Sequence, residues 1–213
     1  MYTETEGIIL KQIKTTGGRR MILLLTEKYG MISAGTSIPE KGRNKSSLAL
    51  RPFTMGRYEL YKGRDSFSIN GAETVKSFYS IGEDIDKYMA ASYVLELTEK
   101  MVPEDEASPR MYELLKSFLE LIADRKTEFD TPVIAYQIKA LAASGLALSQ
   151  NPLLSGASDD KINIVRYIEQ HPMSGLKSLS VSEELRIPLE SQIKQYIFDN
   201  LGIGNLKSET FRI

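Results

Sequence analysis

The chain has 213 residues, of which 42% are hydrophobic and 26% charged, and its formal net charge is −1, a composition typical of soluble globular proteins. The absence of cysteine excludes disulfides, thiolate catalysis and cysteine-ligated zinc, and no apolar run approaches the roughly 20 residues that span a bilayer. Residues 1–6 are polar and acidic, without the basic region and apolar core of a secretory signal, so we expect a cytoplasmic protein.

The first third of the chain predicts five short β-strands. Alternation and short apolar runs, bounded by glycine-containing turns, place them at residues 7–14, 21–26, 30–36, 54–62 and 66–70. Residues 37–51 instead combine Pro39, Gly42 and Asn44 with four cations, which predicts a basic, flexible loop. Five short strands with one long connection favour a small antiparallel barrel. The five-stranded OB-fold, whose strand face and loops bind single strands, fits best.

From about residue 80 the hydrophobic period becomes helical. Helix starts are expected at Ser108-Pro109, Thr131-Pro132, Asp159-Asp160 and Pro188. The single histidine, His171, follows an apolar helical pattern and precedes a proline, which favours a helix C-terminus over a catalytic role. The predicted fold class is therefore α+β and multi-domain, with an OB-fold barrel over residues 1–78 and an α-helical bundle domain over residues 79–213.

The charge is divided between these two parts. Residues 1–75 hold twelve Lys/Arg and seven Asp/Glu, whereas the remainder holds fifteen and twenty-one. A cationic part suits a polyanion, because its side chains can displace counterions condensed on phosphates. The candidate DNA-binding cations are Lys11, Lys14, Arg19, Arg20, Lys41, Arg43, Lys45, Arg51 and Arg57, and Tyr29 and Tyr58 are candidates for stacking on bases. The alternative is a solvated surface loop, with some of the tyrosines in the core.

No motif for catalysis or metal binding stands out. The sequence contains neither a Gly-x-x-x-x-Gly-Lys-Ser/Thr phosphate loop nor a nucleophile elbow. Residues 16–20 carry two glycines and two arginines but lack the spacing of a phosphate loop, which favours a hairpin turn. The acids at residues 84–86 and 104–106 are explained by a helix start and a linker. We therefore expect no enzymatic activity, no cofactor and no metal.

The order of several short motifs carries a family resemblance. They are the apolar strand 21–26 followed by Gly30, Lys45-Ser46, the run 50–53 (Leu-Arg-Pro-Phe), the helical runs 93–97 and 112–115, and the closing runs 200–202 and 206–208. In this order the chain resembles RecO, a family of bacterial DNA-repair and recombination mediators. Many members carry a four-cysteine zinc module where residues 149–160 form a short stretch without cysteine, so no zinc is carried over to this chain.

The resemblance implies an OB-fold followed by a helical domain, and binding of single- and double-stranded DNA with annealing of complementary strands. It implies a nucleoid-associated location and two partners, RecR and the acidic C-terminal tail of the single-stranded DNA-binding protein SSB, which recombinase replaces on DNA. A tail site needs a cation near an apolar pocket, and the candidates are Arg125, Lys126, Lys139 and Arg166. The alternative is a protein-interaction scaffold whose OB-like domain binds protein, since fold alone does not settle function.

Overall fold

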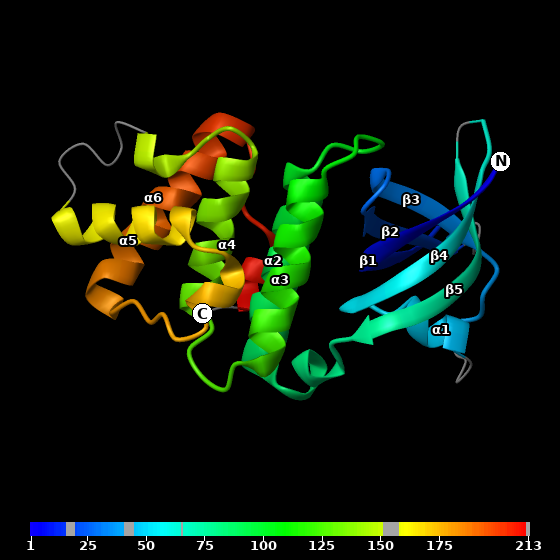
Figure 1. Ribbon diagram of the computed structural model, residues 1–213, viewed down its shortest axis with the longest axis horizontal. Helices are drawn as coiled ribbons and strands as arrows, with labels where there is room; N and C mark the ends of the chain where they lie inside the picture. The colour runs from blue at the N-terminus through cyan, green and yellow to red at the C-terminus, as the bar shows by residue number, and fades with distance from the viewer. Residues whose placement is uncertain (16–19, 41–44, 65, 151–157, 212–213) are drawn as a thin grey trace. The chain divides into compact units, whose positions relative to one another are not determined.

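The computed structural model describes residues 1–15, 20–40, 45–64, 66–150 and 158–211 (Figure 1). The chain divides into two compact units. The first comprises Met1–Glu83 together with Val102–Lys116, and the second comprises Asp84–Met101 together with Ser117–Ile213. The first unit thus includes a helical segment far along the chain in addition to the strands. The sequence-based boundary at residue 78 stays a prediction.

The first unit is a closed five-stranded barrel, as the sequence predicts. Its strands are β1 (Tyr2–Lys14), β2 (Arg20–Thr26), β3 (Gly30–Thr36), β4 (Thr54–Lys62) and β5 (Phe67–Ser77), in the order β1-β2-β3-β5-β4. The β3–β5 pair is parallel and the other pairs are antiparallel. Irregularities in register interrupt β1 between Ile9 and Lys11 and β4 between Glu59 and Leu60, as expected where strands must curve to close a barrel.

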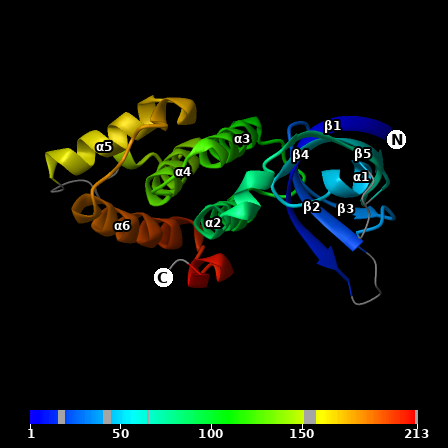
Figure 2. The same cartoon turned by 90° about the horizontal axis from the view of Figure 1, so that it is seen from below.

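A short helix, α1 (Lys45–Ala49), corrects the prediction of a flexible loop over residues 37–51. It lies across one end of the barrel (Figure 2). The hydroxyl of Ser47 donates to the carbonyl of Pro39 at 2.7 Å, and Leu50, just after the helix, is fully buried in the barrel core. The part of this connection that the structure describes is therefore built into the barrel.

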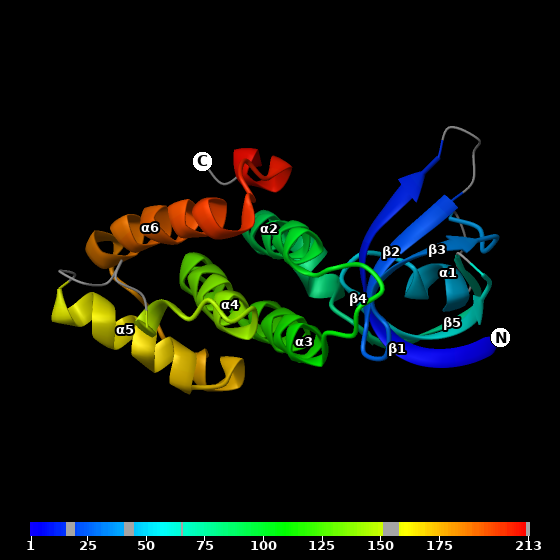
Figure 3. The same cartoon turned by 90° about the horizontal axis from the view of Figure 1, so that it is seen from above.

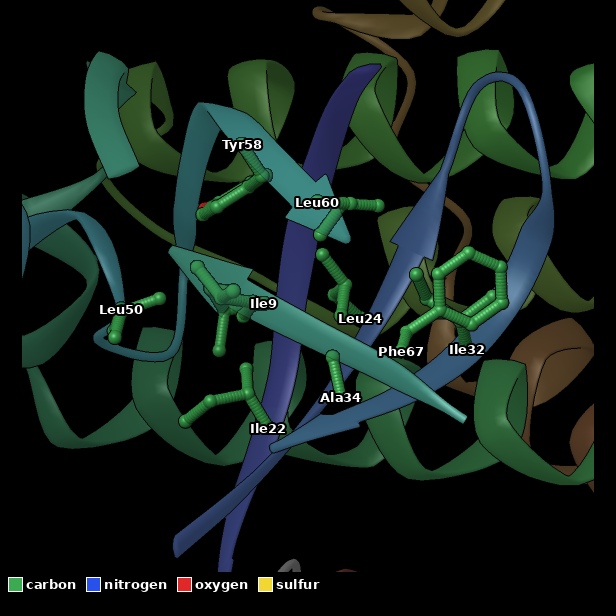
Figure 4. Packing of buried hydrophobic residues seen from close by; sticks show 10 residues of the cluster. Ile9, Ile22, Leu24, Ile32, Ala34, Leu50, Tyr58, Leu60 and Phe67 are labelled. Atoms are coloured by element: carbon green, nitrogen blue, oxygen red, sulfur yellow. The ribbon is translucent and has the colours of Figure 1, made fainter. Parts of the chain in front are cut away.

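The barrel core is formed by side chains from every strand (Figure 4). Ile22 and Leu24 alternate along β2 and point inward together with Tyr58 and Leu60 from β4, as the period of two predicts. The hydroxyl of Tyr58 donates to the carbonyl of Ala49 at 2.8 Å, so the one polar atom of this ring is satisfied inside the core.

Strand β2 is buried on both faces. Leu23 and Leu25, which point away from the core of the barrel, are as buried as the residues that line it. Beside β3, within the same unit, Glu104 forms a bridge with Met31, and the amide of Asp105 donates to the carbonyl of Met31 at 2.9 Å. The continuous apolar run that the sequence shows at residues 21–26 thus indicates a strand with two covered faces.

The second unit is helical. It contains α2 (Ile85–Met101), part of α3 (Pro109–Asp124), α4 (Asp130–Ala143), α5 (Asp159–Gln170) and α6 (Glu183–Leu201). Helix α4 packs against α2, α5 and α6 and is buried along most of its length. Buried polar groups also join α4 to α2. Gln137 of α4 donates to the hydroxyl of Tyr93 at 2.7 Å, and the hydroxyls of Thr98 and Tyr136 lie 2.6 Å apart. Within the described residues, no helix is both long and apolar enough to cross a membrane.

The helix ends agree only in part with the sequence-based prediction. Helix α3 begins at Pro109, and His171 occupies the position after α5, with Nδ1 2.8 Å from the carbonyl of Tyr167. Pro188, however, lies inside α6, which begins at Glu183 after Ser182. Acids at the start of a helix are favourable. Pro188 lies beyond the first turn, so it removes the backbone hydrogen bond to the carbonyl of Glu184 and its ring crowds that carbonyl. Gly202 ends α6 at a φ of 66°, a conformation that suits glycine.

Candidate nucleic-acid interface

Exposed cations are carried by segments that are joined where β1 ends and β2 begins. Gln12 donates to the carbonyl of Leu50 at 2.6 Å, and Arg20 donates to the carbonyl of Ile38, so both strands are tied to the connection that contains α1. The segments joined in this way carry Lys14, Lys45 and Arg51, which we call the basic surface. The predicted residue Lys11 pairs in register with Leu23 and therefore lies on the other face of β1. Lys14, Lys45 and Arg51 are exposed and Lys11 is half-buried.

Two of the predicted DNA-binding cations are engaged in ion pairs. Lys14 Nζ lies 2.7 Å from a carboxylate oxygen of Glu40, although its side chain remains 70% exposed. Arg57 lies on β4 between two acids of β1, with Nε 3.4 Å from Glu4 and Nη2 3.7 Å from Glu6. The structure therefore places Arg57 among acids, away from the basic surface, and its charge is largely balanced there.

Two other predicted residues have structural positions. Arg20 is only 8% exposed. Its Nε donates to the side-chain oxygen of Gln12 at 3.2 Å, and burial lowers the pKa of its guanidinium. Tyr58 is fully buried in the barrel core, where burial raises the pKa of its phenol. The prediction that Tyr58 stacks on bases is wrong, because its ring has no exposed face. Arg20 is therefore not one of the exposed cations, because its Nε and Nη1 donate within the protein and its Nη2 is buried.

Three further predicted cations, Arg19, Lys41 and Arg43, lie outside the described residues. They flank described segments of the basic surface in the sequence, because Arg19 immediately precedes β2 and the other two precede α1. Their assignment to DNA binding stays a prediction.

Tyr29, the remaining predicted residue, belongs to a group of rings and cations elsewhere on the barrel. Its hydroxyl lies 2.8 Å from that of Thr3, and this hydrogen bond, with help from Lys28, lowers the pKa of the phenol. The ring is half-buried and packs on Phe67 at 5.5 Å between centroids. The ammonium groups of Lys28 and Lys62 lie 5.4 and 5.5 Å from the Tyr29 centroid, within the range of a cation–π interaction.

A second pair of rings lies at the beginning of β1. Tyr2 of β1 and Tyr61 of β4 are register partners, and their rings meet edge to face at 5.2 Å. Because side chains alternate along a strand, this ring pair lies on the sheet face opposite Thr3 and Lys62, which contact Tyr29. The sequence does not display the pairing of Tyr2 with Tyr61, because β1 and β4 are about fifty residues apart.

The four predicted partner-binding residues have different surroundings in the helical unit, and their role stays a prediction. Arg125 is a structural link, since it donates to the carbonyls of Glu128, Lys177 and Leu179. Lys139 Nζ contacts the carbonyl of Glu169 at 3.5 Å, and burial lowers its pKa. Lys126 and Arg166 are exposed.

A groove of about 320 Å³ with mixed polar and apolar walls lies elsewhere in this unit, and none of these four residues lines it. It is formed by α2, α6 and the segment after α6, with Leu97 and Phe198 among its walls. The cation at the groove is Lys194, whose Nζ lies 3.2 Å from Glu190 and 2.6 Å from Glu209. Two carboxylates thus face one ammonium, and together these three groups carry a net negative charge.

The segment after α6 is fastened to α2 by Glu96. Its carboxylate accepts the amides of Lys207 and Ser208 at 3.0 and 2.8 Å and the hydroxyl of Ser208 at 2.6 Å. Burial alone would raise the pKa of Glu96, but these hydrogen bonds outweigh it and the pKa lies below its ordinary value.

Among the residues that the structure describes, no three His, Asp or Glu side chains converge as metal ligands.

These features define a class: a closed five-stranded barrel with exposed cations and rings, joined to a helical unit, is the arrangement of an OB-type binding protein. Family models narrow the class. The model described as Recombination protein O N terminal matches residues 1–78, and that described as Recombination protein O C terminal matches residues 82–152. The chain belongs to the Recombination protein O family.

Curated relatives extend the similarity along the chain. The DNA repair protein RecO of Alkaliphilus metalliredigens is 26% identical over 239 aligned positions, which cover 98% of this chain and 97% of the relative. Those of Oceanobacillus iheyensis and Myxococcus xanthus are 30% and 28% identical, and they match 69% and 67% of this chain. These two alignments cover 57% and 59% of the relatives, so the chain matches less than two thirds of their length.

Proposed function

We propose that the protein is a non-enzymatic DNA-repair mediator that binds single- and double-stranded DNA through the basic surface and anneals complementary strands. The observation that carries this proposal is the joining of β1, β2 and the α1 connection by Gln12 and Arg20, which gathers cations from separate segments. Such a surface can screen the repulsion between two phosphate backbones while leaving base edges free to pair. Membership of the family supports the assignment to DNA repair.

The partners belong to the same proposal. With RecR, the protein helps recombinase to replace SSB on single-stranded DNA, and it holds SSB by its acidic C-terminal tail. The groove between α2 and α6 suits such a tail poorly, because Lys194 already faces Glu190 and Glu209. We therefore favour the exposed cations Lys126 and Arg166 as its contacts.

Salt dependence tests the DNA-binding surface. In the triple variant Lys14→Gln, Lys45→Gln, Arg51→Gln, three phosphate contacts are lost, so the slope of log affinity for a single-stranded oligonucleotide against log salt becomes shallower by about 2. Affinity at low salt falls roughly 100-fold. The matched control, Lys100→Gln, Lys177→Gln, Lys207→Gln, removes the same charge from exposed positions of the helical unit. Equal slopes for the two triple variants would contradict the proposed surface.

Annealing tests the activity itself. Complementary oligonucleotides precoated with SSB should anneal faster with the protein than without it, and the Lys14, Lys45, Arg51 triple variant should lose this acceleration. The control variant should keep it. If complementary strands anneal at the same rate with and without the unmodified protein, annealing is not one of its activities.

One observation favours the alternative of a protein-binding scaffold. The strand face that OB-folds commonly use for ligands includes strand 2, and here Leu23 and Leu25 on the outer face of β2 are buried. A scaffold would show no oligonucleotide binding, or a salt slope near zero. A steep slope that depends on the basic surface decides for DNA.

A further inference from the structure

We propose that the groove between α2 and α6 is a docking site for a cationic amphipathic helix of a partner protein. The partner supplies an apolar side chain that packs on Phe198, together with a Lys or Arg that faces Glu190 and Glu209. Its charge is opposite to that of an acidic tail. The site belongs to the helical unit alone, so it does not depend on DNA binding by the barrel.

The groove has three walls, and the third is fastened in place. Leu97 comes from α2, Phe198 from α6, and Gly204 from the segment after α6. Figure 3 shows this segment, in red, beside α2 and the C-terminal end of α6. Because Glu96 of α2 accepts three hydrogen bonds from the segment, the groove is formed before a ligand arrives. Preformed walls lower the entropic cost of binding.

Phe198 is the apolar contact point of the groove. Its side chain is 54% exposed although it is large and aromatic. The backbone of Gly204 approaches the ring so closely that a Cβ at this position would lie 3.2 Å from Phe198 Cδ2. The ring is thus held from one side and open to solvent elsewhere. Aromatic side chains of this kind are enriched among the residues that dominate protein–protein interfaces.

Helix α6 carries a second stripe of side chains besides its buried one. The buried stripe consists of Leu189, Ile193, Tyr196 and Ile197. The second stripe advances by alternate steps of four and three residues, through Ile187, Ser191, Lys194, Phe198 and Leu201. Its ends are apolar and exposed, and its middle residues line the groove. Alternate steps of four and three are the spacing at which two helices pack side by side, which favours a helical ligand.

The charges at the groove favour a cation over an anion. Lys194 faces the carboxylates of Glu190 and Glu209, so one negative charge is in excess among the three groups. Burial lowers the pKa of Lys194, but hydrogen bonds and charges from Glu209 and Glu190 outweigh burial, and the pKa lies above its ordinary value. This ammonium therefore stays charged and engaged with its two acids. An anionic ligand would have to displace one of them.

Two neighbouring features keep this preference. Arg186 also lies near Glu190, but it is shared with Asp130 and Glu183. Helix α6 ends at Gly202, beside the residues of the third wall, and the last carbonyls of a helix carry a partial negative charge. A Lys or Arg of the partner is attracted to this end of the groove.

The test uses three synthetic peptides of about 14 residues, long enough to form a helix on binding. The first has Leu at helical spacing and Lys elsewhere. The second has Glu in place of each Lys, and the third has Ala in place of each Leu. Isothermal titration calorimetry at moderate salt should show that the unmodified protein binds the Leu–Lys peptide about 10-fold or more tightly than either of the others.

Two variants with matched controls locate the peptide. Phe198→Ala should weaken binding of the Leu–Lys peptide about 10-fold, whereas Tyr167→Ala, which removes an exposed ring of α5 outside the groove, should not. Lys194→Gln frees two carboxylates and should strengthen binding of the same peptide about 3-fold. Its control Lys177→Gln removes a lysine that is ion-paired with Asp124 outside the groove, and should leave the affinity nearly unchanged.

Several results would overturn the proposal. Tighter binding of the Leu–Glu peptide, or weaker binding of the Leu–Lys peptide by Lys194→Gln, would assign the groove to an anionic ligand. Equal affinities of Phe198→Ala and Tyr167→Ala would place the peptide elsewhere. If sedimentation shows a dimer that Phe198→Ala dissociates, the occupant is a second copy of this chain.

Melting temperatures of the variants within about 2 °C of the unmodified protein exclude a folding defect as the cause. None of these measurements uses DNA, so failure of the DNA-binding proposal leaves their interpretation unchanged.

Discussion

The basic surface at the end of β1 and the Tyr2–Tyr61 ring pair at its beginning hold their side chains in different ways. At the basic surface, the side chains of Gln12 and Arg20 donate to backbone carbonyls and fix the segments that carry the cations. At the ring pair, the two rings contact each other edge to face, and Glu4 and Glu59 follow on the same sheet face. The basic surface can attract phosphate through charge, which reaches about 10 Å at moderate salt. The ring pair has acids beside it and offers no such attraction.

The comparison depends on which tyrosines of β4 belong to the barrel core, and this gives the largest expected effect. Tyr58→Ala should lower the free energy of unfolding by about 3–5 kcal/mol, because the fully buried ring leaves a cavity. Tyr61→Ala should change it by about 0.5 kcal/mol or less, as at other surface positions. Urea unfolding of both variants measures the difference.

The conservative change Tyr58→Phe serves as the control. It removes only the hydrogen bond to Ala49 and should cost about 1 kcal/mol. If Tyr58→Ala and Tyr61→Ala lower the free energy of unfolding by similar amounts, the two rings do not differ in burial. The assignment of Tyr58 to the core and Tyr61 to the surface would then be wrong.

The predictable part of the fold came from local pattern. Strands β3 and β4 have the predicted bounds, because alternation and glycine turns delimit them in the sequence. Strand β5 continues to Ser77, well beyond its predicted end, and its last residues are exposed. Nothing in their local pattern marks a strand, since it is pairing with β4 that holds them extended. Helix α1 has five residues, too few for a periodic signal.

The candidate site was predictable in composition but less so in position. The period of two places Tyr58 and Tyr61 on opposite faces of β4, yet it does not say which face is inside. Arg20 and Lys14 end neighbouring strands and pair in register, but one is buried and the other exposed. That difference arises from the carbonyl of Ile38, which accepts from Arg20 and is brought near only by the fold. Long-range contacts thus decided which cations remained available.

Arg20 and Lys14 sharpen the comparison with an intermediate effect. Arg20→Gln should lower the free energy of unfolding by about 1.5–3 kcal/mol, because charge-assisted hydrogen bonds to Ile38 and Gln12 are lost. Its affinity for single-stranded DNA should change less than about 3-fold, since the side chain faces inward. Lys14→Gln should show the reverse, with stability nearly unchanged and a shallower salt slope. If Arg20→Gln reduces the salt slope as much as Lys14→Gln, then Arg20 does contact phosphate.

The smallest expected effect concerns Arg57. It lies on β4 opposite Glu6 of β1, and Glu4 and Glu6 balance its positive charge. Arg57→Gln should leave affinity for single-stranded DNA within about 2-fold, because exposed ion pairs leave little net charge to attract phosphate. Removing the acids with Glu4→Gln, Glu6→Gln should release Arg57 and raise affinity at low salt roughly 3- to 10-fold. The variant Glu4→Gln, Glu6→Gln, Arg57→Gln measures how much of the gain in affinity comes from Arg57 and how much from lost repulsion. If this variant keeps the whole gain, Arg57 does not contact the DNA, and the two acids alone keep phosphate away from the middle of β1.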